Sequence, residues 1–111
     1  MKLLIILSLL SLNAFATSSD RKFNIKQYVS GNATTVSTKI LDGYTDRCYL
    51  SIINLGSDAM YVKINSAHSG TEGMKIPANG YWEPSVVPVG ALFVKVGTTT
   101  SAFELTEGSC I

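Results

Sequence analysis

Charge is scarce in this sequence, and neither sign dominates. Nine basic and eight acidic residues among 111 give a formal net charge of +1, and charged residues make up 15% of the chain. Binding to nucleic acid or to an anionic membrane through bulk charge needs a basic stripe that releases counterions. The lysines and arginines are instead spread thinly along the chain. The composition therefore argues against nucleic acid as a partner.

Residues typical of catalytic and metal sites are almost absent. His68 is the only histidine, and the two cysteines form neither a C-x-x-C motif nor a zinc-type cluster. A general base needs a nucleophile within reach and an orienting carboxylate, and Glu72 follows His68 by four residues. No serine lies in a G-x-S-x-G turn, which favours a solvated loop histidine. The sequence predicts no catalytic residue, so we expect the protein not to be an enzyme.

The acidic residues also fail to form a recognisable ligand set. Asp42, Asp46 and Asp58 occur in predicted turns, where aspartate caps local backbone groups. Their spacing matches no calcium-binding loop. Glu72 and Glu83 are the only suggestive pair for glycoside hydrolysis, and nothing in the sequence fixes their separation. We therefore expect neither a metal ion nor another cofactor.

The longest apolar run lies at the N-terminus. Lys2 precedes an apolar stretch at residues 3–12, and residues 13–16 (NAFA) place small side chains where a signal peptidase cleaves. The stretch is about half of the roughly 20 residues needed to cross a bilayer, and no basic stop-transfer segment follows. Residues 1–16 are therefore predicted to be a cleaved signal peptide, which leaves an exported chain without a stable membrane span. Cleavage removes Lys2 and leaves eight basic and eight acidic residues, a formal net charge of zero.

Only two cysteines are present, Cys48 and Cys110. An even number of cysteines in an exported chain predicts one disulfide. The bridge would close most of the domain into one loop, which is worth about 4 kcal/mol in the chain-entropy model. A pair of free thiols is the alternative, but a penultimate residue is usually loose unless something holds it.

After the N-terminal segment, apolar and polar residues alternate. Period two is typical of half-buried β-strands, and no window shows the helical period of 3.6. In one run Met60, Val62 and Ile64 should share a face, and in another Phe103 and Leu105 should do so. The strands are expected near residues 23–29, 36–40, 48–54, 59–65, 74–76, 81–83, 91–96 and 102–106.

This series of short strands, with turn signals between them, predicts a single antiparallel β-sandwich. A small β-barrel is the alternative architecture. The domain is expected at residues 23–111, after a flexible lead at residues 17–22 that is small and polar. The strands at 48–54 and 59–65 are separated by only four residues and are expected to form a hairpin.

Tyr81, Trp82 and Glu83 form the best candidate binding segment. They follow the Asn79-Gly80 turn signal, and exposed tryptophan and tyrosine are the commonest anchors of interfaces and also stack on sugar rings. Turn-flanked aromatic residues lie at strand ends, where the loops of a rigid sandwich gather. Trp82 can instead be the core aromatic residue of a small domain, and the sequence favours that interpretation over a ligand site.

From residue 47 to residue 108 the chain shows a particular order of strands and turn motifs. These are Asn54 at the end of an apolar strand, then residues 61–64 (YVKI), 70–73 (GTEG), 76–80 (IPANG), 82–83 (WE), 89–94 (VGALFV) and 103–108 (FELTEG). This order resembles small all-β modules encoded by bacteriophages. The resemblance implies a virion-associated role in decoration, fibre or tail-proximal positions, and it brings no catalytic residue set.

Two features depart from tailed-phage structural proteins, which assemble in the cytoplasm. A signal peptide and a disulfide fit a phage that assembles at or through the host envelope, such as a filamentous one. We therefore expect an exported structural or adsorption module whose partners are other virion proteins or a host cell-surface receptor, with oligomers possible. A secreted or periplasmic bacterial protein that binds a surface glycan or protein is the alternative.

Overall fold

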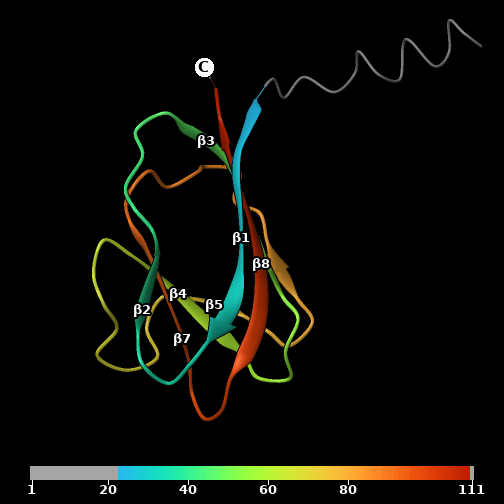
Figure 1. Cartoon of the computed structure of the whole chain (residues 1–111). Helices are drawn as coiled ribbons and strands as arrows, with labels where there is room; N and C mark the ends of the chain where they lie inside the picture. The colour runs from blue at the N-terminus through green and yellow to red at the C-terminus, as the bar shows by residue number, and fades with distance from the viewer. Residues whose placement is uncertain (1–22, 111) are drawn as a thin grey trace, which may run out of the picture.

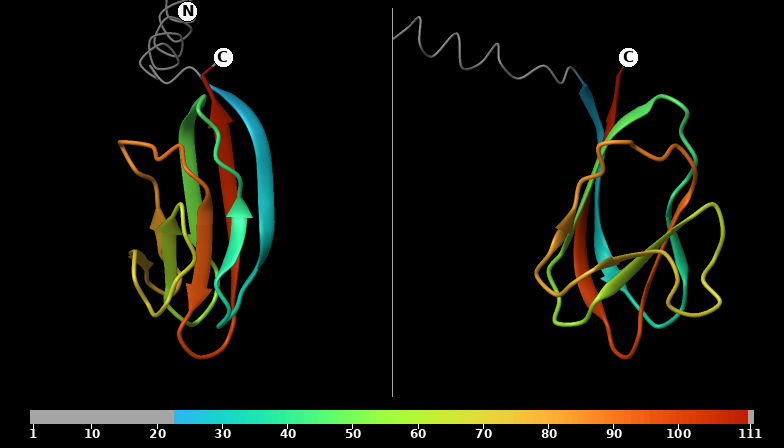
Figure 2. Two further views of the ribbon diagram at one scale, coloured as in Figure 1. Left: turned by 90° about the vertical axis from the view of Figure 1, so that its left-hand side faces the viewer. Right: turned by 180° about the vertical axis from the view of Figure 1, so that it is seen from behind.

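The computed structural model describes residues 23–110. The predicted signal peptide and lead, residues 1–22, lie outside the described residues, as does residue 111. Within the described part every regular element is a β-strand, and the strands form two four-stranded antiparallel sheets (Figures 1 and 2). This arrangement confirms the predicted all-β fold and is that of a small β-sandwich.

The two sheets draw their strands from both halves of the chain. Sheet I contains, in spatial order, β1 (Asn24–Ala33), β8 (Ser101–Ser109), β3 (Arg47–Asn54) and β6 (Tyr81–Trp82). Sheet II contains, in spatial order, β2 (Thr38–Leu41), β7 (Leu92–Val96), β4 (Met60–Ile64) and β5 (Met74–Ile76). Figure 1 views the sandwich from the side, with β2 and β7 on the left and β1 and β8 on the right.

Alternation along the strands builds the hydrophobic core between the sheets. Met60 and Val62 of β4 are buried, and Ile64 packs against the same core. Phe103 and Leu105 of β8 approach it from the opposite sheet and are also buried. Both predicted faces are therefore confirmed. The fully enclosed core consists of Ala33, Leu41, Leu50, Ile52, Met60, Val62, Ile76, Leu92, Val94, Val96, Phe103 and Leu105.

The predicted hairpin between the third and fourth strands is wrong. β3 lies in sheet I, between β8 and β6, whereas β4 lies in sheet II, between β7 and β5. The connection between them is therefore an arch that crosses from one sheet to the other. A short turn-rich connection between two alternating strands is compatible with either topology, because the period of two does not say which sheet a strand joins.

Asn54 and Gly56 shape this arch. The buried Asn54 amide nitrogen donates to the carbonyl oxygen of Asp58 at 2.7 Å, and its amide oxygen accepts from the backbone N–H of Gly56 at 3.0 Å. A Cβ atom on Gly56 would lie 2.6 Å from the Cα of Ser101, so only glycine fits where the arch passes β8. These bonds turn the chain out of sheet I instead of pairing β3 with β4.

A buried ion pair lies between the sheets beside the apolar core. Arg47 Nε donates to Glu107 Oε2 at 2.7 Å, and both side chains are almost fully buried. The guanidinium also donates to the carbonyl oxygens of Asp42, Pro88 and Gly90 at 2.7 to 2.9 Å. Arg47 thereby connects β3 to β8 and to the two loops that flank sheet II.

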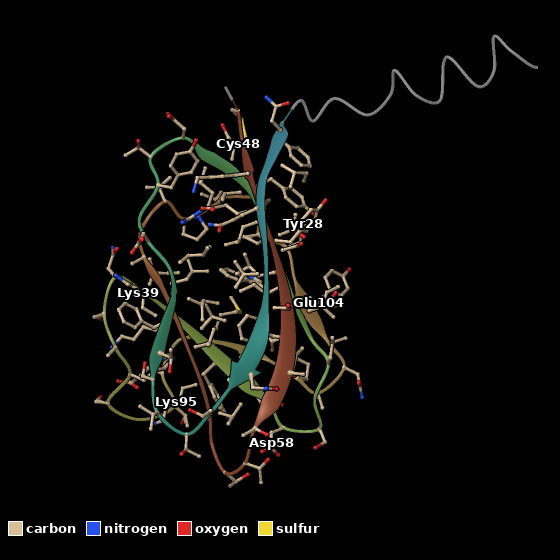
Figure 3. All side chains as sticks on the ribbon, in the orientation of Figure 1. Tyr28, Lys39, Cys48, Asp58, Lys95 and Glu104 are labelled. Atoms are coloured by element: carbon tan, nitrogen blue, oxygen red, sulfur yellow. A yellow bond between two sulfur atoms is a disulfide. The ribbon has the colours of Figure 1, made fainter. Side chains whose placement is uncertain are left out.

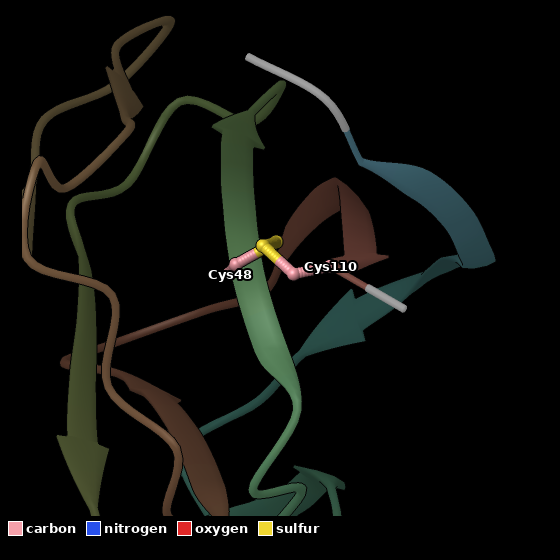
Figure 4. Close-up of a disulfide and its surroundings, with 2 residues drawn as sticks. All are labelled: Cys48 and Cys110. Atoms are coloured by element: carbon pink, nitrogen blue, oxygen red, sulfur yellow. A yellow bond between two sulfur atoms is a disulfide. The ribbon is translucent and has the colours of Figure 1, made fainter.

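The two cysteines form the predicted pair. The sulfur atoms of Cys48 and Cys110 lie 2.08 Å apart, at bonding distance, and the Cα atoms lie 5.6 Å apart (Figure 4). The backbone N–H of Cys110 also donates to the carbonyl oxygen of Asp46 at 3.3 Å. The end of the described chain is therefore held against the start of β3.

Candidate functional site

The structure places the three residues of the predicted binding segment in different environments. Tyr81 pairs with Ile53 on the outer face of sheet I and is 73% exposed. Trp82 pairs with Ile52 on the inner face, where it is half-buried and packs against the core. The carboxylate of Glu83 is exposed and accepts a hydrogen bond from the Tyr49 hydroxyl at 2.6 Å. Trp82 therefore has a packing role, and Tyr81 is the residue of this segment available to a partner.

Strand pairing places other residues beside Tyr81. In sheet I the register puts Ser30 opposite Glu104, Glu104 opposite Ile53, and Ile53 opposite Tyr81. The next row on the same face places Tyr28 opposite Thr106 and Thr106 opposite Ser51. We call this surface the open face, and it consists of Tyr28, Ser30, Ser51, Ile53, Tyr81, Glu104 and Thr106.

The open face is exposed and combines two tyrosines and an isoleucine with a carboxylate. Tyr28 is 74% exposed and Ile53 41% exposed. Tyrosine offers a large contact area with little side-chain entropy to lose, and its hydroxyl can donate or accept. Glu104 is exposed between these residues, and among residues 23–110 its carboxylate has no hydrogen-bond or ion-pair partner. Figure 3 shows Tyr28 and Glu104 on the side of the molecule opposite Lys39.

A depression of about 330 Å³ lies on this side of the molecule along β1 and β8. Its lining residues are Tyr28, Val29, Ser30, Glu104, Leu105 and Thr106. The depression is open to solvent, and Glu104 is the one acidic residue that lines it. It can receive a side chain from a partner, and Glu104 would favour a partner with a hydrogen-bond donor or a cation at that point.

The outer face of sheet II is different, because the chain's own loop covers it. The register places Lys63 beside Phe93, and Lys95 beside Tyr61. Lys95 Nζ donates to the carbonyl oxygen of Gly70 at 3.0 Å, and Lys63 Nζ donates to that of Ala67 at 3.4 Å. Residues 65–73 are thereby held against these lysines. The two faces of the sandwich thus differ in their availability to a partner.

His68 belongs to this covering loop and is half-buried instead of solvated as expected. Its backbone N–H donates to Ser37 Oγ at 2.9 Å, and its Nδ1 lies 2.7 Å from the same oxygen. Burial lowers the pKa of His68, because the charged form is penalised in the enclosed site. Nε2 is buried and has no hydrogen-bond partner among the described residues.

The carboxylate of Glu72 does not complete a catalytic arrangement with His68. It accepts hydrogen bonds from the Ser69 hydroxyl and the Gly70 backbone N–H, which hold the pKa of Glu72 well below its ordinary value. It also lies 3.6 Å from Lys63 Nζ. Since these groups orient the carboxylate and no hydrogen bond joins it to the imidazole, the cluster anchors the loop to sheet II.

The three turn aspartates lie at separate points, and the side chains of Asp58 and Asp42 are engaged locally. Asp58 Oδ2 accepts from the Thr98 hydroxyl at 3.0 Å and the Thr99 backbone N–H at 2.9 Å, and hydrogen bonds from Thr99 and Thr98 lower the pKa of Asp58. Asp42 pairs with Lys39 Nζ at 2.8 Å. Within residues 23–110, no group of three or more histidine, cysteine, aspartate or glutamate side chains could hold a metal ion.

Of the residues of the open face, only Tyr81 was a candidate from the sequence. Tyr28 and Glu104 belong to strands that are far from Tyr81 in sequence, and only the order β1-β8-β3-β6 brings them together. Alternation in residues 101–106 identifies Glu104 and Thr106 as outward-facing. It does not identify the neighbouring strands, so the composition of the face could not be predicted.

Comparison of the chain with protein-family models, with curated proteins and with solved structures found no match. In residues 23–110 there is also no helix long and apolar enough to cross a membrane.

Alanine substitutions at Tyr81 and Trp82 should separate their roles. Trp82→Ala removes a half-buried ring from the core and should lower the free energy of unfolding by about 2 to 3 kcal/mol, less than for a fully buried tryptophan. Tyr81→Ala should change it by about 0.5 kcal/mol or less, since the side chain is mostly exposed. Urea unfolding followed by circular dichroism measures both. Equal losses would contradict the assignment of the two rings to opposite faces.

Proposed function

We propose that this protein is an exported, non-enzymatic binding module that attaches to other proteins through the open face. The observation that carries the proposal is the contrast between the two sheets. The outer face of sheet II is covered by residues 65–73, whereas the open face of sheet I exposes Tyr28, Tyr81 and Glu104, whose carboxylate has no partner among residues 23–110. Exposed tyrosines around a carboxylate on a rigid sheet are well suited to protein recognition.

Three features support export and a place in a virion. Residues 1–16 have the pattern of a signal peptide, and the Cys48–Cys110 pair suits an oxidising compartment. The order of motifs from residue 47 to residue 108 resembles phage-encoded all-β modules. We therefore propose a structural or adsorption role in a phage that assembles at the host envelope, with another virion protein or a host receptor as the partner.

A secreted or periplasmic bacterial protein is the second candidate, because export and the disulfide fit it equally well. In that case the exposed tyrosines would bind a surface glycan or protein. The neighbouring genes distinguish the two candidates. Phage replication and coat genes would favour the virion role, and bacterial metabolic genes would favour the secreted protein.

The virion role can be tested by the composition of purified particles. An epitope-tagged chain, expressed in a host that produces the phage, should co-sediment with extracellular particles in a density gradient. The double variant Tyr28→Ala with Tyr81→Ala should be exported at the normal level, since both side chains are exposed, but its amount on particles should fall about tenfold or more. Immunoblots of gradient fractions and of total exported protein measure both quantities.

Val86→Ala is the matched control. Val86 is 87% exposed and lies in the segment between β6 and β7, which contributes no residue to the open face. This variant should be found on particles at the wild-type level. If the wild-type chain is absent from particles, the virion role is wrong. If the tyrosine variant is retained as well as the control, the open face is not the binding surface.

A further inference from the structure

Each of the two sheets ends in two edge strands, and the backbone groups on the outer side of an edge strand can pair with another strand. In sheet I these are β1 and β6, and in sheet II they are β2 and β5. An exposed edge presents a row of unpaired N–H and C=O groups, which is a template for strand addition. Proteins usually block such edges by making them short or by placing proline, lysine or a bulge on them.

Three of the four edges are blocked in these ways. β6 has two residues and is followed closely by Pro84. β5 has three residues, contains Lys75 and is followed directly by Pro77. β2 has four residues and its register shifts between Lys39 and Leu41. None of the three offers a long regular ladder to an added strand.

β1 lacks these blocks over most of its length. It has ten residues, and within the described chain it pairs only with β8 (Figure 2, left). Its one register shift lies near its start, between Ile25 and Gln27. Its one charged side chain, Lys26, is turned toward its own molecule, with Nζ 3.5 Å from Glu107 and 4.6 Å from the centre of the Tyr44 ring. Residues 28–33 contain no proline and no charge.

We propose that a second copy of this chain adds its own β1 to this edge. The two strands run antiparallel about a two-fold axis and join the two copies of sheet I into one eight-stranded sheet. The proposal is independent of the function proposed above. In this dimer the two open faces lie side by side on one continuous surface. Both copies of Tyr28 lie near the line where the two β1 strands meet, which we call the seam.

The chemistry of β1 favours its own copy as the occupant. Its outward-facing residues over this stretch are Tyr28, Ser30 and Asn32, which are neutral and can face themselves without repulsion. The chain without residues 1–16 has no net formal charge, so long-range repulsion between copies is absent. The depression along β1 and β8 lies beside the seam and can receive a side chain from the added strand.

Sedimentation velocity of the exported, disulfide-bonded chain provides the test. The wild-type chain should change from monomer to dimer between about 1 μM and about 1 mM, the range over which interfaces of modest affinity dissociate. Hydrogen exchange at the amides of residues 28–33 should slow over the same range, because the N–H groups on the outer edge of this stretch become paired in the dimer.

A charge exchange across the seam identifies the interface. Tyr28→Lys with Asn32→Lys, and Tyr28→Glu with Asn32→Glu, each place like charges opposite or diagonal to one another in the two-fold pair. Each variant alone should dimerise about tenfold or more weakly than the wild type. An equal mixture of the two should recover dimers, because lysine then faces glutamate. Ser57→Lys with Ser85→Lys is the matched control for added charge, since both serines lie in exposed loops.

The outcomes separate the alternatives. A wild-type chain that stays monomeric through the whole range overturns the proposal and leaves the edge to a strand of another protein. Dimers that persist in both charged variants place the interface elsewhere and also overturn it. Dissociation of the control variant, or failure of the mixture to recover dimers, would rule out two-fold pairing through β1. Circular dichroism of each variant verifies that the sandwich is folded.

Discussion

Replacing Arg47 by methionine should lower the free energy of unfolding by about 3 to 5 kcal/mol, the usual cost of removing one member of a buried ion pair. The substitution leaves the carboxylate of Glu107 buried without its main partner. It also removes the hydrogen bonds that the guanidinium donates to the carbonyl oxygens of Asp42, Pro88 and Gly90. A domain of this size has about 5 to 15 kcal/mol of stability, so the loss should be visible as a large shift in urea unfolding.

The loss should depend on pH in a defined direction. Burial raises the pKa of Glu107, but hydrogen bonds from Gln27 and Arg47 outweigh burial and hold the pKa below its ordinary value. In the wild type this carboxylate therefore stabilises the fold above about pH 4.5, and that contribution is lost as the pH falls through the folded pKa. In Arg47→Met the pKa of Glu107 should lie above its wild-type value, because the hydrogen bond and charge of Arg47 are lost while burial remains, so protonation costs the variant less stability than it costs the wild type. The difference between the two proteins should narrow as the pH falls below about 4.5.

The double variant Arg47→Met with Glu107→Leu tests the cause of the loss. If the buried carboxylate that has lost its guanidinium partner is responsible, removing the carboxylate should recover part of the stability lost in Arg47→Met. Gln27 loses its acceptor in the double variant, so recovery should be incomplete. A double variant less stable than Arg47→Met would show that lost packing, not the charge of the buried carboxylate, dominates.

The sequence could predict the strands because their local pattern is strong. In β4 the order Met60-Tyr61-Val62-Lys63 alternates without interruption, and β8 does the same around Phe103 and Leu105. One face of each strand is buried whichever strand it pairs with. The alternation of apolar and polar residues is therefore visible in the sequence even when the partner strand is unknown. The class of fold follows from several such runs and the absence of a helical period.

Strand order and the polar interior could not be predicted in this way. The arch after β3 depends on Asn54 and on the close passage of Gly56 beside Ser101, which are contacts between distant parts of the chain. In the sequence, Arg47 and Glu107 look like ordinary charged residues near strand ends. Nothing in the local pattern shows that they form a buried ion pair with each other. The open face depends on the same long-range pairing.

Removing the disulfide by Cys48→Ala with Cys110→Ala should lower the free energy of unfolding by about 4 kcal/mol. The bridge closes a loop with a sequence separation of 62, and in the chain-entropy model a loop of this size restricts the unfolded chain by that amount. Because β3 and β8 already pair along most of their length, the native contacts should survive and the change should come mainly from the unfolded state. Urea unfolding of the double variant and of the wild type measures the difference.

The location of the bridge provides a second readout of the same prediction. Cys110 follows β8 directly, and Ser109 pairs with both Asn24 of β1 and Arg47 of β3. Loss of the bridge should therefore speed amide exchange at the end of β8 more than in β4 or β7, because fraying begins at an untied chain end. The single variant Cys110→Ala, with the Cys48 thiol blocked by alkylation, is the control. It also lacks the bridge but keeps the Cys48 side chain, so it should lose as much stability as the double variant if the bridge is the cause. A double variant within about 1 kcal/mol of the wild type would show that the unfolded chain is already restricted without the bridge.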